Sequence, residues 1–351
     1  MTEAVRIGIL TGGGDAPGLN AAIRAVSRRA FERGARVTGV KNGWAGALGK
    51  GDFEELSAAS VRGILPLGGT ILGTSRTNPL RETGGVEACI RLLRDQGIDG
   101  LVAIGGDDTL SVAVAMSEAG YPVVGLPKTI DNDLSATEFC IGFDTALGIV
   151  VEALDRLHTT AAAHHRVMVV EVMGRDTGWV AMLGGLAGGA DMILIPEFQT
   201  ALDDVVQHLH RRRGEGEDFS IIVVAEGVKM ESLQPVGAAA TGEQKRDAFG
   251  HPQLSRQGVG EAISTRIEEV TGFESRVTVL GHLQRGGAPS AVDRIWATRL
   301  GVAAADLLLE HRAGLVPVRQ DGEVKIVPIR DVVAETRRVP ESLFRLQRIF
   351  G

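Results

Sequence analysis

The chain has 351 residues, of which 44% are hydrophobic and 23% are charged, and its formal net charge is −7. This length allows two domains with large buried cores, and the composition is typical of a soluble globular protein. The negative charge argues against a nucleic-acid or anionic-membrane surface, and one run of three arginines at 211–213 does not reverse it. No apolar stretch reaches the roughly 18 residues that a membrane span needs.

The N-terminus and the cysteines indicate the compartment. Residues Met1–Arg6 lead almost directly into a predicted strand, so we expect no signal peptide. Cys89 and Cys140 lie in apolar contexts, where core thiols are expected rather than a disulfide framework or a metal site. These features predict a cytoplasmic protein.

Short β-rich apolar runs alternate with helical patterns along almost the whole chain. The predicted strands are Arg6–Leu10, Leu101–Ile104, Val123–Leu126, Val167–Glu171, Met192–Ile195, Ile221–Ala225 and Arg276–Leu280. The predicted helices are Asn20–Arg33, Val86–Gln96, Thr109–Ala119, Gly148–Thr160 and Ser255–Thr271. Such alternation indicates βαβ units and predicts an α/β fold with a mainly parallel sheet. The segment Lys229–Gln253 interrupts the pattern, and we predict a long surface loop there.

A glycine-rich segment, Thr11–Asn20, follows the first predicted strand and opens a helix. Glycines let main-chain amides approach a phosphate, and a helix N-terminus adds favourable partial charge. Pro17 stands where a dinucleotide fingerprint has its third glycine, and the segment lacks the ending of a Walker loop. The segment is therefore either a phosphate-binding loop or a tight turn without a ligand.

A second glycine-rich segment, Gly105–Leu110, again joins a strand to a helix. Asp107 is suited to hold Mg²⁺, a hard cation that prefers oxygen ligands. Asp108 beside it is suited to cap the helix, and capping is compatible with a functional role. The two adjacent carboxylates repel each other, which favours a cation nearby.

The densest polar cluster is Pro127–Asp133, which places a lysine, a threonine, two carboxylates and an amide directly after a buried strand. Ligands of open α/β sheets bind at such a strand end. If the strand stays extended, Asp131 and Asp133 point the same way. One carboxylate is then placed to deprotonate a hydroxyl while the other assists. A solvated turn with a helix cap is the alternative.

Several cations stand at the edges of apolar runs, where arginine forks suit phosphate oxygens as well as surface carboxylates. They are Arg76, Arg166, Arg175, Arg276, His282 and Arg285. A zinc site is not expected. The adjacent pair His164 and His165, and His282 elsewhere in the chain, have no further ligand at the spacing of a metal site.

Together these segments resemble the 6-phosphofructokinase family over essentially the whole chain, in the family's order. The matching segments are Gly13–Asn20, Gly105–Thr109, Pro127–Asp133, Val170–Arg175, Ala225–Gly227 and Leu280–Gly287. The resemblance implies two Rossmann-like α/β/α domains with mainly parallel sheets. Residues 1–142 with 284–334 would bind the phosphoryl donor and Mg²⁺, and residues 143–283 with 335–351 would bind fructose 6-phosphate. The implied reaction is Mg²⁺-dependent phosphoryl transfer to the 1-hydroxyl of fructose 6-phosphate, a reversible step of glycolysis.

The same resemblance implies roles for individual residues. Asp131 is implied to take the proton from the sugar 1-hydroxyl, and Asp107 to hold Mg²⁺. The residues implied to orient or stabilise the reacting groups, or to bind the donor, are Thr129, Asp133, Arg76, Arg175 and Gly13. The residues implied to bind fructose 6-phosphate are Met173, Gly174, Glu226, Arg166, Arg276, His282 and Arg285. Arg166 and Arg276 are expected from a neighbouring subunit, which predicts a homo-oligomer with shared active sites.

Two positions decide the phosphoryl donor. ATP-using members of the family have glycine at both, whereas this chain has Asp108 and Lys128, as in the pyrophosphate-dependent branch. A carboxylate beside an α-phosphate costs on the order of 4 kcal/mol at ~4 Å and an effective dielectric constant of ~20. Lys128 can pair with pyrophosphate oxygens. We therefore predict pyrophosphate as the donor, with ATP as the alternative.

Regulation by nucleotides is not expected from the sequence. The allosteric nucleotide site of bacterial ATP-dependent relatives is only partly present, since Arg24 and Arg28 fit it but His158 and Asp191 depart from it. Loss of effector control is therefore expected.

A non-catalytic subunit that senses sugar phosphates is a further alternative, although an intact Asp131 argues against it. A Rossmann dehydrogenase is disfavoured by the missing third glycine.

Overall fold

A computed structural model of the chain describes residues 4–230 and 258–350, and it divides them into two compact units. The first unit comprises residues 4–145 and 285–336. The second comprises residues 146–230, 258–284 and 337–350. The domain boundaries predicted above lie close to these, while the ligand assigned to each domain stays a prediction. Most of the predicted surface loop at 229–253 lies outside the described residues.

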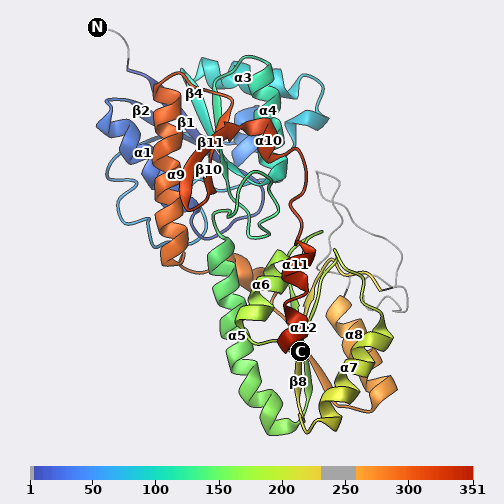
Figure 1. The fold of residues 1–351 in the computed structure, drawn as a ribbon. Helices are drawn as coiled ribbons and strands as arrows, with labels where there is room; N and C mark the ends of the chain where they lie inside the picture. The colour runs from blue at the N-terminus through green and yellow to red at the C-terminus, as the bar shows by residue number, and fades with distance from the viewer. Residues whose placement is uncertain (1–3, 231–257, 351) are drawn as a thin grey trace. The chain divides into compact units, whose positions relative to one another are not determined.

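The first unit is built on a seven-stranded sheet with the order β11-β10-β5-β4-β1-β2-β3 (Figure 1). Its strands are β1 Arg6–Thr11, β2 Arg36–Val40, β3 Phe53–Leu56, β4 Gly100–Gly105, β5 Val123–Pro127, β10 Leu315–Gln320 and β11 Glu323–Pro328. The strands from β10 to β2 run parallel, while β3 and β11 pair antiparallel with their neighbours. The carboxyl ends of β5, β4 and β1 therefore lie side by side.

Helices cover both faces of this sheet. They are α1 Leu19–Glu32, α2 Gly43–Ala45, α3 Gly85–Asp95, α4 Asp107–Glu118, α9 Ala291–Leu309 and α10 Ile329–Val332, with the short helices η1 Gly46–Lys50 and η2 Pro79–Arg81. Because side chains alternate along a strand, Val102 and Ile104 of β4 join the core under α1 and α9, which pack together (Figure 1). Leu101 and Ala103 join the core under α3 and α4. Burial on both faces explains why the central strands are continuous apolar runs.

The second unit is built on a four-stranded parallel sheet with the order β7-β8-β6-β9. Its strands are β6 Val167–Val172, β7 Met192–Leu194, β8 Ser220–Ala225 and β9 Ser275–Val279. Its helices are α5 Phe143–His164, which begins in the first unit, α6 Trp179–Ala187, α7 Leu202–Gly214, α8 Val259–Thr271, η5 Gly281–Arg285, α11 Glu341–Phe344 and α12 Gln347–Phe350. Helix α8 packs on β6 and β9, and α6 packs on β7 and β8. Strand β9 ends the sheet on one side.

The predicted α/β fold with mainly parallel sheets is confirmed. Every predicted strand overlaps an observed one, whereas β2, β3, β10 and β11 were not predicted. Cys89 and Cys140 are both buried, as expected of core thiols. Within the described ranges, no helix combines the length and apolar character needed to cross a membrane.

Candidate active site

The carboxyl ends of β1, β4 and β5 bring three of the predicted polar segments together in the first unit. The loop after β1 touches the helix after β4, since a Cβ atom added to Gly12 would lie 2.5 Å from the Thr109 hydroxyl. The segment after β5 joins both. The Lys128 amide donates to the Gly105 carbonyl over 3.0 Å, and the Lys128 ammonium donates to the Gly12 carbonyl over 3.1 Å. Parallel strands adjacent in the sheet dictate this meeting.

The loop between β1 and α1, residues 12–18, is called the glycine loop below. It is fixed by hydrogen bonds of its own backbone. The Gly13 amide donates to the Ser75 carbonyl over 3.2 Å, and the Thr74 hydroxyl donates to the Gly13 carbonyl over 2.6 Å. These bonds hold the loop against the segment that carries Arg76, an exposed side chain. Since the Gly13 amide already has an acceptor, Gly13 contributes the shape of the loop rather than an available donor in this conformation.

Lys128 lies under the glycine loop and is only 3% exposed. Its ammonium donates to the carbonyls of Gly12 and Gly14, over 3.1 and 2.5 Å. A buried ammonium needs such acceptors, because burying a charge without them is costly. The lysine therefore shapes the loop and also adds positive potential beneath it, and a positive potential favours an anionic ligand.

The acidic segment after β5 forms a turn. The Asp131 amide donates to the Thr129 hydroxyl over 3.1 Å, and that hydroxyl lies 3.4 Å from the Asp131 carboxylate. Asp131 is only 4% exposed. Strand β5 ends at Pro127, and Asn132 adopts a left-handed conformation with φ of 53°. The expectation that Asp131 and Asp133 point the same way rested on an extended strand and therefore does not apply.

Asp107 and Asp108 form the first turn of α4, which follows Gly106. Among the described residues, no three His, Cys, Asp or Glu side chains cluster as a metal cage would require. Mg²⁺ usually keeps several waters and binds one or two carboxylates together with substrate phosphates. The Asp107 carboxylate thus fits an ion that is completed by a phosphate donor and water.

Two further side chains of the first unit contact the glycine loop. Arg285, predicted to bind the sugar phosphate, donates to the Asp15 carbonyl over 3.1 Å, and a Cβ atom on Gly14 would lie 2.5 Å from its guanidinium. Thr109 was not singled out from the sequence. Its hydroxyl is buried and has no hydrogen-bond partner in the described part of the chain. A buried hydroxyl normally has a partner, so Thr109 is a candidate for contact with a ligand. The sequence signal that could have identified it was its place at the end of the matching segment Gly105–Thr109.

The second unit places four predicted residues at the carboxyl ends of β6 and β8. Met173, Gly174 and Arg175 follow β6, and Glu226 follows β8. The Arg175 amide donates to the Glu226 carboxylate over 3.3 Å. A Cβ atom on Gly174 would lie 2.5 Å from the Thr177 carbonyl, so this tight turn requires glycine.

Helix η5 carries His282 to the same edge of the second sheet. The Met173 amide donates to the Gln284 side-chain oxygen over 2.8 Å, which ties η5 to the end of β6. Gln284 is fully buried, and its side-chain nitrogen has no hydrogen-bond partner among the described residues. Sequence reasoning missed Gln284, although it lies within the matching segment Leu280–Gly287.

Arg166 and Arg276 lie at the opposite side of the second sheet, where its strands β6 and β9 begin. We call this side the amino edge. Arg166 directly precedes β6, and Arg276 near the start of β9 is in register with Met168. Met173 follows the other end of β6, and a strand of six residues spans roughly 20 Å. Within one chain, these two arginines therefore lie far from Met173 and Glu226.

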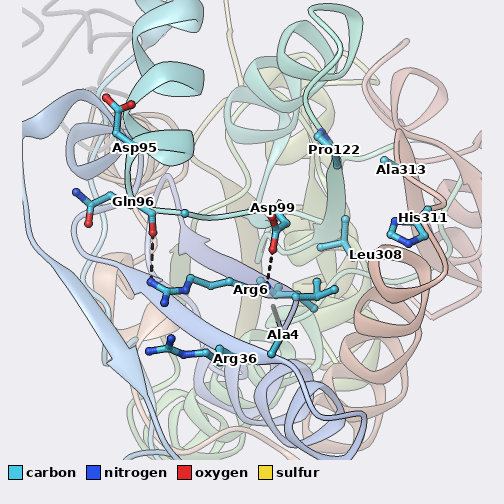
Figure 2. Close-up of a pocket in the computed structure, with 14 residues that line it drawn as sticks. Ala4, Arg6, Arg36, Asp95, Gln96, Asp99, Pro122, Leu308, His311 and Ala313 are labelled. Carbon is cyan, nitrogen blue, oxygen red and sulfur yellow. Dashed lines mark hydrogen bonds between the residues drawn. The ribbon is translucent and has the colours of Figure 1, made fainter. Parts of the chain in front are cut away.

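A separate cavity of about 730 Å³ lies in the first unit at the amino ends of β1, β2 and β4 (Figure 2). Arg6, one of the charged residues that line it, is held by hydrogen bonds within the chain. The Arg6 amide donates to the Asp99 carboxylate over 2.7 Å, and the Arg6 guanidinium donates to the Gln96 carbonyl over 3.2 Å. None of the predicted site residues lines this cavity.

The chain is similar to known proteins over its whole length. The family model described as Phosphofructokinase matches residues 6–308. The chain is 49% identical over 347 residues to the pyrophosphate–fructose 6-phosphate 1-phosphotransferase of Amycolatopsis methanolica, covering 99% of each chain. It is 44% identical over 342 residues to the ATP-dependent 6-phosphofructokinase of Chloroflexus aggregans, covering 95% of this chain and 92% of the relative.

Solved structures show the same relationship. The phosphofructokinase of Pichia pastoris in the T-state matches 95% of this chain with a TM-score of 0.83 and 35% sequence identity. This chain spans 36% of that longer chain. The resemblance recognised from the sequence motifs is thus confirmed, and the chain belongs to the phosphofructokinase family.

Proposed function

We propose that the protein transfers a phosphoryl group from pyrophosphate to the 1-hydroxyl of fructose 6-phosphate, giving fructose 1,6-bisphosphate, as a reversible Mg²⁺-dependent step of glycolysis. The observation that carries the choice of donor is the meeting of Lys128 with the glycine loop, beside the helix that Asp107 and Asp108 begin. Relatives with similar identity are named for pyrophosphate and for ATP. Identity alone therefore does not separate the donors, and we base the choice of pyrophosphate on Lys128 and Asp108.

Asp131 is proposed as the general base. Its buried carboxylate accepts the proton of the 1-hydroxyl while that oxygen bonds to the transferred phosphorus and the bridging bond of pyrophosphate breaks, releasing phosphate. Thr129 fixes the turn that carries Asp131, and Asp133 is proposed to assist in orienting the centre. Arg76 and Arg175 are the cations proposed to offset the negative charge that develops on the phosphoryl group. Mg²⁺ held by Asp107 would supply further charge neutralisation of the pyrophosphate oxygens.

Asp108 is proposed to exclude ATP. Pyrophosphate has no group where the α-phosphate of ATP would lie, so the carboxylate costs pyrophosphate little. With ATP, the same carboxylate would repel the α-phosphate by on the order of 4 kcal/mol at ~4 Å and an effective dielectric constant of ~20.

Sugar binding is proposed for the second unit. The residues proposed to hold fructose 6-phosphate there are Met173, Gly174, Glu226 and His282, with Arg285 from the first unit. Arg166 and Arg276 lie roughly 20 Å from Met173 along the sheet. We therefore propose that these two arginines bind the 6-phosphate in the site of a second copy of the chain, in a homo-oligomer.

The test is a comparison of initial rates with pyrophosphate and with ATP, at matched fructose 6-phosphate and Mg²⁺ concentrations. We expect turnover with pyrophosphate and loss of that turnover when a chelator removes Mg²⁺. A preference for ATP would assign the chain to the activity named for the Chloroflexus relative. No turnover with either donor would favour a non-catalytic sugar-phosphate sensor.

A further inference from the structure

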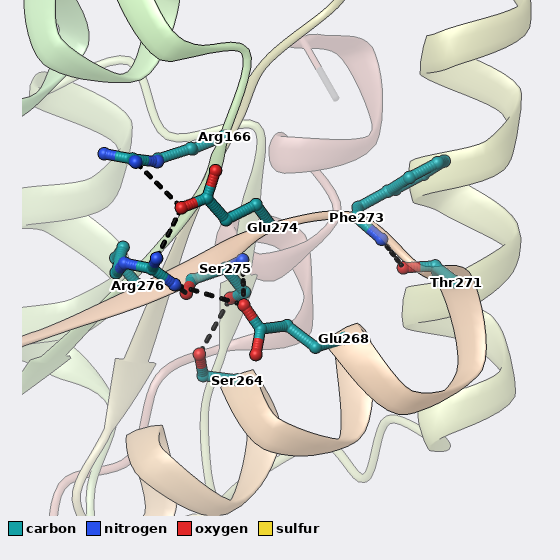
Figure 3. A network of polar contacts seen from close by, with 8 residues as sticks. All are labelled: Arg166, Ser264, Glu268, Thr271, Phe273, Glu274, Ser275 and Arg276. Atoms are coloured by element: carbon teal, nitrogen blue, oxygen red, sulfur yellow. Dashed lines mark hydrogen bonds and ion pairs between the residues drawn. The ribbon is translucent and has the colours of Figure 1, made fainter.

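A carboxylate lies between the two arginines at the amino edge of the second sheet (Figure 3). The sheet register explains this arrangement. Val167 of β6 pairs with Ser275 of β9, and the Val167 amide donates to the Glu274 carbonyl over 2.9 Å. Arg166 and Glu274, the residues just before this pair, are thus neighbours. Arg276 is two residues beyond Glu274 and shares its face, because strand side chains alternate.

One oxygen of Glu274 serves both arginines. The Arg166 guanidinium donates to Glu274 Oε1 over 2.8 Å, and the Arg276 guanidinium donates to the same oxygen. Glu268 of α8 supports the arrangement from the other side. It accepts from Arg276 over 3.2 Å and from the Ser275 amide over 2.8 Å. The two cations and two anions therefore form one connected network (Figure 3).

The charges explain why such a carboxylate is needed. Two guanidinium groups side by side repel each other, and their long side chains otherwise keep considerable rotamer freedom. Glu274 offsets the repulsion and fixes both groups. Its hydrogen bond with Arg166 is the main cause of a lowered pKa for the Glu274 carboxyl, so this carboxyl is ionised at neutral pH.

The network leaves the arginines able to bind a further anion. A guanidinium carries five N–H donors, and the bond from Arg166 to Glu274 uses its NH2 group. The Arg166 side chain is 24% exposed, so part of it is reachable from outside the unit. The Arg276 side chain is 51% exposed and therefore reachable from outside the unit. A phosphate dianion suits two guanidinium groups that are held together.

We propose that Glu274 is a positioning residue, which holds Arg166 and Arg276 as a preformed pair for the phosphate group of fructose 6-phosphate. The inference rests on the proposed function, in which these arginines bind that phosphate. A pair that is ordered before binding pays less conformational entropy when the ligand arrives, and this raises affinity. Glu274 acts on sugar-phosphate binding through the arginines and takes no part in the proton transfer.

The opposite role is physically distinct and has the opposite sign. If Glu274 mainly competed with the phosphate for the guanidinium groups, its removal would strengthen binding of the sugar phosphate. Positioning requires that removal weakens binding. The sign of the change in KM therefore decides between the two roles.

The experiment compares Glu274→Ala with a matched control, Glu269→Ala. Glu269 is an exposed carboxylate on α8 that pairs with Arg266 over 2.8 Å. We expect Glu274→Ala to raise KM for fructose 6-phosphate about tenfold, with kcat and KM for pyrophosphate unchanged within about twofold. The control should match the wild type. Glu274→Gln keeps an acceptor oxygen and should fall between the two.

A second variant separates positioning from loss of folding. Since Glu274 acts through the arginines, adding Glu274→Ala to Arg166→Ala should raise KM for fructose 6-phosphate by less than Glu274→Ala alone does. Unchanged or lowered KM in Glu274→Ala, or full additivity in the double variant, would overturn the inference.

Calorimetric titration with fructose 6-phosphate keeps this test separate from the proposed function. A wild type that binds the sugar phosphate but turns over neither donor would contradict the proposed activity alone, and Glu274→Ala should then weaken binding about tenfold. A wild type that turns over pyrophosphate while Glu274→Ala leaves KM unchanged would contradict the inference alone. A wild type that does not bind fructose 6-phosphate would overturn both.

Discussion

The carboxyl edge of the first sheet and the amino edge of the second hold their charged groups in contrasting ways. At the first, Lys128 and Asp131 are 3% and 4% exposed. Backbone carbonyls of the same unit accept from the Lys128 ammonium, and the Thr129 hydroxyl accepts from the Asp131 amide. At the second, the Arg276 side chain is 51% exposed and is held by carboxylates that are also partly exposed. Buried groups in fixed geometry suit chemistry, because they need little reorganisation. An exposed but organised pair of cations suits recognition of a group brought from outside the unit.

Removing the proposed base should have the largest effect. Asp131→Asn keeps the size of the side chain but cannot accept the sugar proton. We expect kcat to fall by roughly 10²–10⁴-fold, the usual range for acid–base catalysis, with KM for fructose 6-phosphate close to the wild-type value. Steady-state kinetics with pyrophosphate measures both. Near-native turnover would remove Asp131 from the chemistry and break the contrast between the two edges.

The residues proposed to select the donor, Asp108 and Lys128, come next. Asp108→Gly removes a repulsion of on the order of 4 kcal/mol, which corresponds to at most roughly a thousandfold in ATP binding. Asp108→Asn keeps the volume of the side chain and loses its charge, so it separates the effect of charge on ATP binding from the effect of volume. Measurement of kcat/KM for both donors gives the answer. An Asp108→Gly enzyme that still rejects ATP would show that this carboxylate does not set the donor.

Lys128→Gly should weaken use of pyrophosphate, because it removes a cation and also the bonds to Gly12 and Gly14. Lys325→Ala, an exposed lysine on β11, is the control for loss of a positive charge. Since Lys128 follows β5 and Asp108 begins the helix after the neighbouring strand β4, the double variant should not be additive. Equal loss in both lysine variants would point to net charge rather than to the loop.

The proposed sharing of the site between two copies of the chain gives a further test. Arg166→Ala should raise KM for fructose 6-phosphate by roughly 10- to 150-fold, the range for losing a hydrogen bond to a charged group. Mixing Arg166→Ala subunits with Asp131→Asn subunits should produce hybrid sites that combine an intact arginine with an intact base. Recovery of activity in the mixture is expected. If hybrids demonstrably form and stay inactive, the arginines do not serve a second copy.

In the first sheet, the sequence predicted the central strands β1, β4 and β5 and missed the outer four strands, for physical reasons. Central strands buried on both faces are continuous apolar runs, which are easily recognised. Strand β10 contains Pro317, and β11 at the sheet edge carries the exposed Glu323 and Lys325, so neither is such a run. The Asp321-Gly322 pair between them is a strong hairpin signal. Strand β2 begins with the exposed Arg36 and contains a glycine, which lowers its strand character.

Motif spacing identified candidate catalytic and binding residues, but it did not predict how they are held. That Lys128 lies under the glycine loop depends on β5, β4 and β1 being neighbours, which sheet order alone decides. Arg285 reaches the Asp15 carbonyl from a segment far along the chain. Glu274 is two residues from Arg276 in sequence, but its place beside Arg166 follows from the β6–β9 pairing. Such tertiary contacts leave no local pattern.

The smallest effect on kcat is expected at Asp293. This residue tests whether a buried carboxylate in the first unit must be catalytic. Asp293 is fully buried and accepts from the Gly142 amide over 2.7 Å and from the Thr145 amide and hydroxyl over 2.8 and 2.5 Å. Burial outweighs these bonds and raises the pKa of Asp293 from 3.8 to about 6. These contacts lie where α5 begins, so we interpret Asp293 as a structural residue.

A raised pKa in the folded protein fixes the sign of the effect on stability. The stabilisation is complete well below pH 3.8, where the carboxyl is protonated in both states, and it is lost as the pH rises to about 6 and above. A shift of about two units corresponds to about 3 kcal/mol. Asp293→Asn cannot titrate. The wild-type free energy of unfolding minus that of the variant should therefore fall by about 2 kcal/mol between pH 4 and 7 in urea titrations, while kcat of the variant stays near the wild-type value. A difference that rises with pH would show that the hydrogen bonds outweigh burial, and a large loss of kcat would give Asp293 a role in the reaction.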